Sequence, residues 1–141
     1  MRVVIDTNVL ISSIFWTGKP KQILNKVRHG GILFLTSGIL LRELKEVLIE
    51  KNKPFKLSDE EAERIIIEMR ELAEIIPTHT RETVCQDEKD NRVLECAIDG
   101  SAEFIVTGDV HLLKLHPYKG IQITTVTDFL RYCEGSLPKE R

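Results

Sequence analysis

Short apolar runs alternate along the chain with longer segments in which apolar residues recur every three or four positions. The short runs are rich in β-branched residues, which is typical of strands buried in a parallel sheet. Strands are predicted at residues 2–5, 32–36, 75–78, 104–107 and 121–125. Because helices separate these strands, the pattern predicts an α/β protein: a three-layer α/β/α sandwich whose central parallel sheet carries helices on both faces.

The periodic segments predict the helices, and some of them carry start signals. Ser58 and Glu61 form a capping box, and Pro20 falls in the first turn of its helix. Another helix is expected to follow Asp90 and to end at Gly100. The remaining helices are predicted at residues 9–15, 20–29, 39–51, 58–74, 110–115 and 129–132.

The 141 residues contain no internal repeat, low-complexity tract or Pro/Gly-rich linker. One domain is therefore predicted over residues 1–135, with a loose tail at 136–141. No apolar run approaches the ~18 residues of a membrane span, and no secretory signal is recognised, so a cytoplasmic location is expected. The cysteines lack a C-x-x-C pair and are expected to be reduced thiols: Cys85, Cys96 and Cys133.

The net charge of −2 hides an uneven distribution. The segment 59–74 holds seven acids against two bases, which leaves the rest of the chain with a charge of +3. This distribution is compatible with a basic surface beside a compact acidic site, although it does not require one.

Acidic residues stand where a parallel sheet binds its ligands. Asp6 follows the first predicted strand and Asp109 follows the fourth, and ligands of such sheets bind beyond the carboxyl ends of the strands. Glu43 falls at the margin of the apolar face of its helix, and Asp90 stands close to the start of the next helix but one. Both can face the same edge of the sheet.

Carboxylates that converge without His or Cys suit Mg²⁺ or Mn²⁺ better than zinc. Such a metal site supports phosphoryl transfer, because the cation holds phosphate oxygens and lowers the pKa of a bound water. Each acid also has a simpler interpretation. Asp6 and Asp109 could only cap helices, and Glu43 and Asp90 could be solvated surface acids. The spacing alone leaves both interpretations open.

Several other chemistries lack their residues. The acids form no Ser/His/Asp or Cys/His arrangement for covalent catalysis. Neither a phosphate-binding loop of the G-x-x-x-x-G-K-[ST] type nor a G-x-G-x-x-G fingerprint occurs. An aspartyl-phosphate phosphatase needs Asp-x-Asp after the first strand, and Asn8 stands at the second position.

Four segments resemble the acidic motifs of the PIN-domain nucleases. They are Asp6–Ile11, Leu41–Leu44, Asp87–Ala97 and Ala102–Leu112. The resemblance spans about residues 1–132. It is strongest to the branch that contains toxin components of toxin–antitoxin systems, the relatives of the VapC toxins. One difference is Asn91, where some relatives have a further Asp.

The resemblance implies a PIN-like fold and a metal-dependent endoribonuclease that hydrolyses phosphodiester bonds of single-stranded RNA with Mg²⁺ or Mn²⁺, leaving a 5′-phosphate. The family's catalytic, metal-binding acids match Asp6, Glu43, Asp90 and Asp109. Polar residues that would support the site match Thr7, Asn8 and Thr107, with Asp87 as a rival to Asp90. The resemblance further implies a homodimer and a cognate antitoxin protein as partner.

Other residues have more than one interpretation. Arg92, Lys19 and Lys21 are candidates for contacts with RNA phosphates, or are simply solvated bases. Trp16 could stack on a base or pack at a dimer interface. The competing function is a catalytically silent RNA- or protein-binding module on the same fold, which a strict need for divalent metal would exclude.

Overall fold

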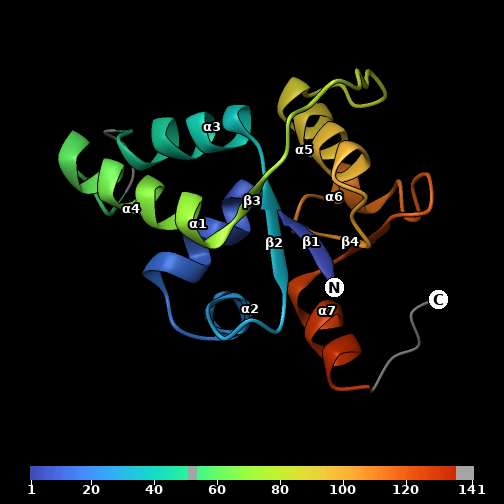
Figure 1. The fold of residues 1–141 in the computed structure, drawn as a ribbon, viewed down its shortest axis with the longest axis horizontal. Coiled ribbons are helices and arrows are strands. Elements are labelled where there is room, and N and C mark those ends of the chain that lie inside the picture. Colours follow the sequence, from blue (N-terminus) through green and yellow to red (C-terminus); the bar gives the residue numbers. More distant parts are fainter. Residues whose placement is uncertain (51–53, 136–141) are drawn as a thin grey trace.

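The computed structural model describes residues 1–50 and 54–135 and confirms the α/β sandwich (Figure 1). Its sheet has the order β3-β2-β1-β4-β5, and every neighbouring pair is parallel. The strands are β1 (Arg2–Ile5), β2 (Leu33–Thr36), β3 (Glu74–Ile75), β4 (Phe104–Val106) and β5 (Gln122–Thr124). The helices are α1 (Thr7–Phe15), α2 (Lys19–Arg28), α3 (Gly38–Leu48), α4 (Asp59–Leu72), α5 (Glu88–Asp99), α6 (Val110–Leu113) and α7 (Val126–Cys133).

Alternate residues of the central strands enter two separate hydrophobic cores. Val3 and Ile5 of β1 pack into a core built with α1, α2, α3, α4 and α7. Val4 points to the opposite face, where its core is built mainly with α5 and α6. Because successive side chains of a strand point to opposite faces, this alternation places helices on both sides of the sheet, as predicted.

The strand order creates a switch point between β1 and β4. From β1 the chain moves through β2 to β3 on one side, and it then returns to the other side of β1 for β4 and β5. The loops that follow β1 and β4 therefore leave in different directions, which opens a crevice at their carboxyl ends. Asp6 and Asp109 follow these two strands.

Several predicted boundaries are wrong. Helix α5 begins at Glu88, so Asp90 lies in its first turn and not before it. The cause is Asp87, whose Oδ1 accepts a hydrogen bond from the backbone N–H of Lys89 and caps the helix. Helix α3 ends at Leu48, whereas its predicted end at residue 51 lies outside the described residues.

The strand predicted at 75–78 is also wrong in its bounds, because β3 covers only residues 74–75. The loose tail predicted at 136–141 lies outside the described residues.

Among the residues that the structure describes, no helix combines the length and the apolar character needed to cross a bilayer. The three cysteines are free thiols, and burial raises the pKa of Cys96 to about 12.

Candidate active site

Asp6 and Asp109 are connected through the side chain of Thr107. The Thr107 hydroxyl donates to Asp6 Oδ2 at 2.7 Å and accepts from the backbone N–H of Asp109 at 3.0 Å. Register between β1 and β4 places Ile5 opposite Val106, so Asp6 and Thr107 come next on adjacent strands. The sheet itself therefore brings these residues together at the switch point.

Burial raises the pKa of Asp6 above its ordinary value. The hydrogen bond from Thr107 and a 2.8 Å bond from the backbone N–H of Thr7 act in the opposite direction, whereas the charges of Asp109 and Asp87 raise the pKa further. Asp6 thus lies in the electric field of two other acids of the same edge. The prediction that Asp6 caps α1 is confirmed, and this cap is compatible with a role of Asp6 in a metal site.

Glu43 reaches the same acidic edge from α3. Desolvation raises the pKa of its half-buried carboxyl, and a hydrogen bond with the Thr7 side chain and the charge of Lys89 lower it. The charges of Asp6 and Asp87 raise it again. Glu43 is therefore no solvated surface acid, and Thr7 connects it with the start of α1.

Asp90 is the most perturbed acid of this edge. Its side chain is 5% exposed, and its Oδ2 has no hydrogen-bond partner among the described residues. Burial raises its pKa to about 7, and the neighbouring charges of Asp109, Asp87 and Asp6 contribute in the same direction. A buried oxygen without a donor, surrounded by negative charge, is a position that a cation would stabilise.

Asp87 differs from Asp90 in both exposure and contacts. It is exposed and caps α5 through the 3.0 Å hydrogen bond from the Lys89 amide. Asp90 has its free oxygen buried on the inner side of the first turn of the same helix. Of the two rivals for a metal ligand, Asp90 is therefore the better suited.

The donor set at this edge fits a hard divalent cation, since it offers carboxylate oxygens and the orphaned Oδ2 of Asp90. Within residues 1–50 and 54–135, however, no three Asp, Glu, His or Cys side chains are gathered closely enough to hold a metal as they stand. Asp6, Asp87 and Asp109 instead accept hydrogen bonds from backbone amides, as Asp109 Oδ1 does from the His111 amide at 2.7 Å. Mutual repulsion favours this spread arrangement.

A polar stripe along α5, unforeseen from the sequence, binds the preceding loop. Asn91, Glu95 and Asp99 are spaced four residues apart, so they lie along one face of the helix. Their side chains accept hydrogen bonds from backbone amides of residues 79–85, which run antiparallel to the helix. The pairs are Asp99 with His79 and Thr80, Glu95 with Glu82, and Asn91 with Cys85. This stripe fixes the loop beside Asp87 and Asp90.

A second set of contacts ties the same loop to residues 116–121. Glu82 is buried and accepts hydrogen bonds from the Tyr118 hydroxyl and from Lys119 Nζ at 3.1 Å. The Tyr118 bond, followed by the Lys119 charge, lowers the pKa of Glu82, and the same bond raises the pKa of Tyr118 to about 12. The loop is thus held from both sides.

The basic residues considered for RNA contacts already have partners. Arg92 forms ion pairs with Glu88 at 3.3 Å and with Glu95 at 3.0 Å. Lys21 donates to a backbone carbonyl at the end of α1, and Lys19 to Thr127. In Figure 1, α2, which carries both lysines, lies at the lower end of β2, whereas α3 and α5 begin near its upper end.

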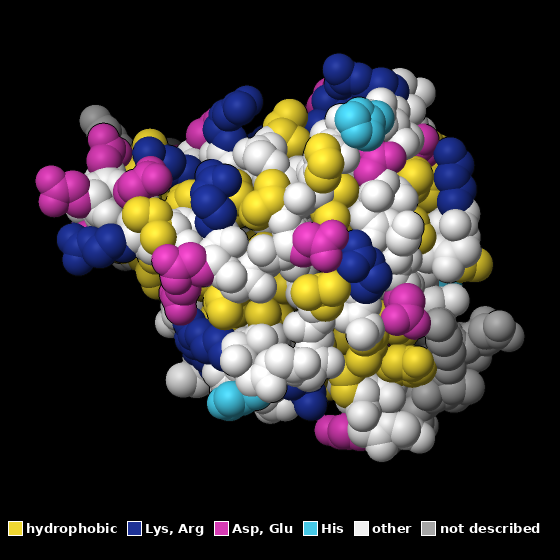
Figure 2. Space-filling view, in the orientation of Figure 1, with side chains coloured by type: hydrophobic (Ala, Val, Ile, Leu, Met, Phe, Trp, Pro, Cys, Tyr) yellow, Lys and Arg dark blue, Asp and Glu magenta, His cyan; other side chains and the backbone are white. Residues whose placement is uncertain are grey.

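Two further residues considered for the site or for RNA contacts, one polar and one aromatic, lie at the surface. Asn8 is exposed in the first turn of α1. Trp16 is 48% exposed, and its ring makes edge contacts with Phe15 and Phe55. On the face shown in Figure 2, Lys and Arg side chains are interspersed with Asp and Glu, so no continuous basic surface covers this side.

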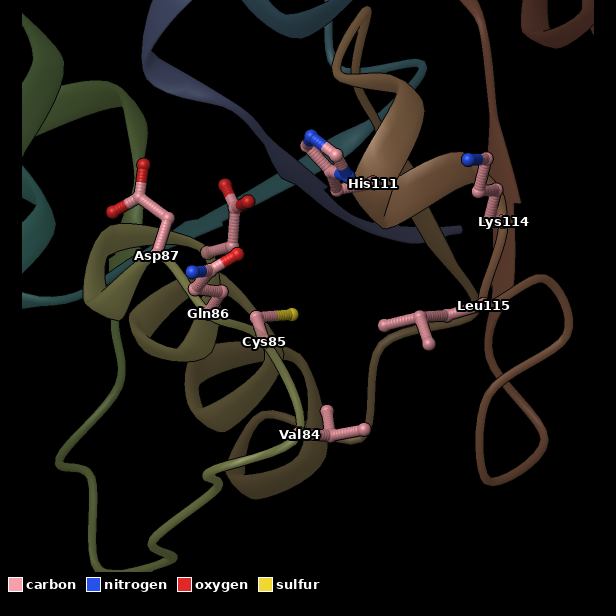
Figure 3. Close-up of a pocket in the computed structure, with 8 residues that line it drawn as sticks. Val84, Cys85, Gln86, Asp87, His111, Lys114 and Leu115 are labelled. Carbon is pink, nitrogen blue, oxygen red and sulfur yellow. The ribbon is translucent and has the colours of Figure 1, made fainter.

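A pocket of ≈490 Å³ opens beside Asp87 and Asp90 (Figure 3). One wall comes from the loop 84–87 and the first turn of α5, and the other from α6 and the residues after it. Its lining residues are Val84, Cys85, Gln86, Asp87, Asp90, His111, Lys114 and Leu115. The acidic edge and this pocket therefore form one continuous site.

Together, fold and site define a three-layer α/β protein with an acidic centre at the switch point of its parallel sheet. Residues 2–111 match the PIN domain family. The chain therefore belongs to the PIN domain family, as the sequence motifs indicate.

Individual proteins show the same similarity. An uncharacterized protein of Methanocaldococcus jannaschii, MJ1680, is 32% identical over 117 residues, which cover 82% of this chain and 75% of the relative. VapBC2 from Rickettsia felis, crystallised with a DNA fragment from its promoter, has a TM-score of 0.63 and 16% identity, covering 89% of this chain and 98% of that one. VapBC-1 from nontypeable Haemophilus influenzae has a TM-score of 0.60 and 16% identity, covering 90% of this chain and 99% of that one.

Proposed function

We propose that the protein is a metal-dependent endoribonuclease that hydrolyses phosphodiester bonds of single-stranded RNA. Its candidate catalytic residues are Asp6, Glu43, Asp90 and Asp109. The observation that carries the proposal is the burial of Asp90 among other acids, with an oxygen that has no donor and a pKa of about 7. Burial of Asp90 among like charges is unfavourable without a cation, and PIN-domain nucleases generally use divalent metals.

Bound Mg²⁺ or Mn²⁺ would polarise the scissile phosphate and lower the pKa of an attacking water. The chain's own residues prepare for this. Thr107 holds Asp6 and the backbone of Asp109 in a fixed relation, and Thr7 supports both Asp6 and Glu43. Asp90 contributes the desolvated carboxylate. Because the four acids are not yet gathered at ligand spacing, binding a cation requires some of these side chains to rotate.

The similarity to VapBC structures supports a more specific role, a toxin of a toxin–antitoxin pair. In this role the partners would be single-stranded RNA as substrate, a cognate antitoxin protein as inhibitor and a second copy of the chain in a homodimer. The exposed ring of Trp16 is available for such a contact.

The test is cleavage of a mixed-sequence single-stranded RNA in Mg²⁺, in Mn²⁺ and in EDTA. Wild type should cut only with metal, and Asp6→Asn should lose about 10³-fold or more in rate. Asp59→Asn is the matched control, since Asp59 is an exposed acid in the first turn of α4. It should keep wild-type activity.

Two results would contradict the proposal. Cutting that continues in EDTA would exclude the metal-dependent mechanism. RNA binding without cutting in either metal, by a folded protein, would favour the silent binding module on the PIN fold.

A further inference from the structure

The pocket of Figure 3 has features that metal binding by the acids leaves unexplained. Its volume of ≈490 Å³ falls in the ~300–1,000 Å³ range of small-molecule sites. Asp87 and Asp90 line one side, but the opposite side carries a lysine and a leucine that no cation needs. The pocket is therefore larger and chemically more varied than a metal site requires.

One end of the pocket is apolar. In Figure 3, Val84 and Leu115 point toward each other from opposite walls, with the Cys85 thiol beside them. Val84 is 52% exposed, which is unusual for a valine held in a loop with several fixed contacts. These side chains therefore place apolar surface on both walls at this end of the pocket.

The other end carries the positive charge of Lys114. Lys114 and His111 are exposed and extend from α6 and its C-terminal turn, across the pocket from Asp87 and Asp90. In Figure 3 the Lys114 side chain lies beside α6, on the same wall as His111 and Leu115. A matching ligand is therefore weakly polar at one end and anionic at the other.

The polar stripe of α5 keeps the loop wall in place. Asn91 binds Cys85 through both its amide oxygen, at 2.9 Å, and its amide nitrogen, at 3.0 Å. Glu95 accepts from the Glu82 amide at 3.0 Å, two residues before Val84. The wall is therefore held in place on both sides of Val84, so the pocket does not depend on a ligand to form.

We propose that this pocket binds one nucleotide of the RNA substrate, next to the bond that is cut. The base lies between Val84 and Leu115, and its phosphate contacts Lys114. Asp87 and Asp90 belong to both the pocket and the acidic edge. When the pocket holds one nucleotide, the phosphodiester next to it in the same RNA strand therefore lies at the acids. The inference rests on the proposed nuclease function, because that function makes the bound nucleotide part of an RNA strand. It assigns to Val84 the base preference at one position of that RNA.

The first experiment needs no catalysis. Methyl signals of Val84 and Leu115 are followed by NMR in EDTA while the four nucleoside 5′-monophosphates are added one at a time. Nucleotides should shift both methyl signals, and one base should bind more tightly than the others. Ribose 5-phosphate and inorganic phosphate should leave the methyl signals in place at equal concentration. Equal methyl shifts from ribose 5-phosphate would overturn the base contact.

The second experiment measures anisotropy of a fluorescein-labelled 12-nucleotide RNA, again in EDTA. Val84→Ser should weaken binding by about fivefold. Lys114→Gln should reduce the slope of log K against log salt by about 0.7, the value for one phosphate contact on a single strand. Matched controls are Ile67→Ser, which alters an equally exposed apolar residue on α4, and Lys45→Gln, whose amine pairs with Glu63. Both controls should bind as wild type does.

The third experiment links the pocket with the cut. Sequencing of the 5′ ends released from a random RNA pool should give a base preference at one position beside the cut, and Val84→Ser should relax it. If wild type cuts nothing, the nuclease proposal fails, while the methyl signals in EDTA still decide the pocket. Unmoved methyl signals, or wild-type affinity in both pocket variants, would overturn the nucleotide site.

Discussion

The hydroxyl of Thr107 donates a 2.7 Å hydrogen bond to Oδ2 of Asp6, a residue 101 positions earlier in the chain. The same oxygen accepts from the Asp109 amide. One small side chain therefore sets the relation between two acids that follow different strands. In the proposed nuclease Thr107 would be a positioning residue, because it would act on the reaction only through Asp6 and Asp109.

Replacing Thr107 with Val should remove the hydrogen bonds of the Thr107 hydroxyl while keeping the side-chain volume nearly unchanged. The change removes the donor to Asp6 Oδ2 and leaves a buried carboxylate oxygen unpaired, at a cost of about 1–3 kcal/mol in unfolding free energy. It should also raise the pKa of Asp6, since the Thr107 bond lowers that pKa. The pH profile of RNA cleavage should therefore move to higher pH on its acidic limb.

Thr124 provides the control for this substitution. It is buried at the end of β5, and its hydroxyl has no hydrogen-bond partner among the described residues. Thr124→Val should leave the pH profile unchanged and should keep or raise stability by up to about 1 kcal/mol in urea unfolding. Equal effects of the two substitutions would show that the Thr107 hydroxyl has no special role.

Asp90 should make the metal-free protein less stable as the pH rises. Its pKa is about 7 in the folded chain against an ordinary value of 3.8, so the native state binds more protons than the unfolded state between these values. Stability from this group is complete below about pH 4 and falls until about pH 7. Asp90→Asn should remove this fall, and it should raise the melting temperature in EDTA at pH 7.5.

The matched control for Asp90→Asn is Asp87→Asn, because Asn caps helices as well as Asp does. This variant should keep most of the fall of stability with pH, because burial is the largest cause of the raised pKa of Asp90 and the Asp87 charge contributes less. Addition of Mn²⁺ should raise the melting temperature of wild type and of Asp87→Asn, but not that of Asp90→Asn. The reverse pattern would assign the metal to Asp87.

Asn91→Asp should destabilise the protein, although it restores an acid that some relatives carry. Asn91 is fully buried, accepts from the Cys85 amide and donates to the Cys85 carbonyl. A carboxylate cannot donate, so it would face that carbonyl oxygen, and we expect a loss of about 2–4 kcal/mol in urea unfolding. Asn25→Asp on the exposed side of α2 should change stability by less than about 0.5 kcal/mol.

Tyr118→Phe should have an effect that depends on pH. The pKa of Glu82 is lowered by the Tyr118 hydrogen bond and by Lys119, so this stabilisation is present above its ordinary value of 4.5 and is lost as the pH falls. We expect a cost of about 1–2 kcal/mol at pH 7 that shrinks below about pH 4. Tyr132→Phe, which removes a hydroxyl from α7, should show no such pH dependence.

The positions of β1, β2, β4 and β5 follow from the sequence because each is a short apolar run that ends at or just before a polar residue. Asp6 and Asp109 could be assigned to one edge for the same reason, since parallel strands share their carboxyl ends. The start of α5 does not follow from the hydrophobic pattern, because residues 87–92 carry no apolar residue and the helical period begins only at Val93. The signal that could have located it is Asp87 itself, a capping residue with an acid three positions later.

The loop contacts could not be predicted from periodicity. The stripe of Asn91, Glu95 and Asp99 is recognisable as one helix face, but residues 79–85 follow no period, so nothing in the sequence pairs them with it. The ion pairs of Arg92 could not be predicted from periodicity either. Its position near Asp90 favoured an RNA contact, whereas its ion pairs depend on the inward direction of Glu95, which only the fold determines.

The wide separation of the acids along the chain has a consequence during translation. Asp6 leaves the ribosome early, but its partner Thr107 is held by a backbone bond to the carbonyl of Thr124 in β5. The site is therefore incomplete until almost all of the domain has emerged and β5 has joined the sheet. A nascent chain with the proposed activity would thus be harmless to the messenger RNA that encodes it for most of its own synthesis.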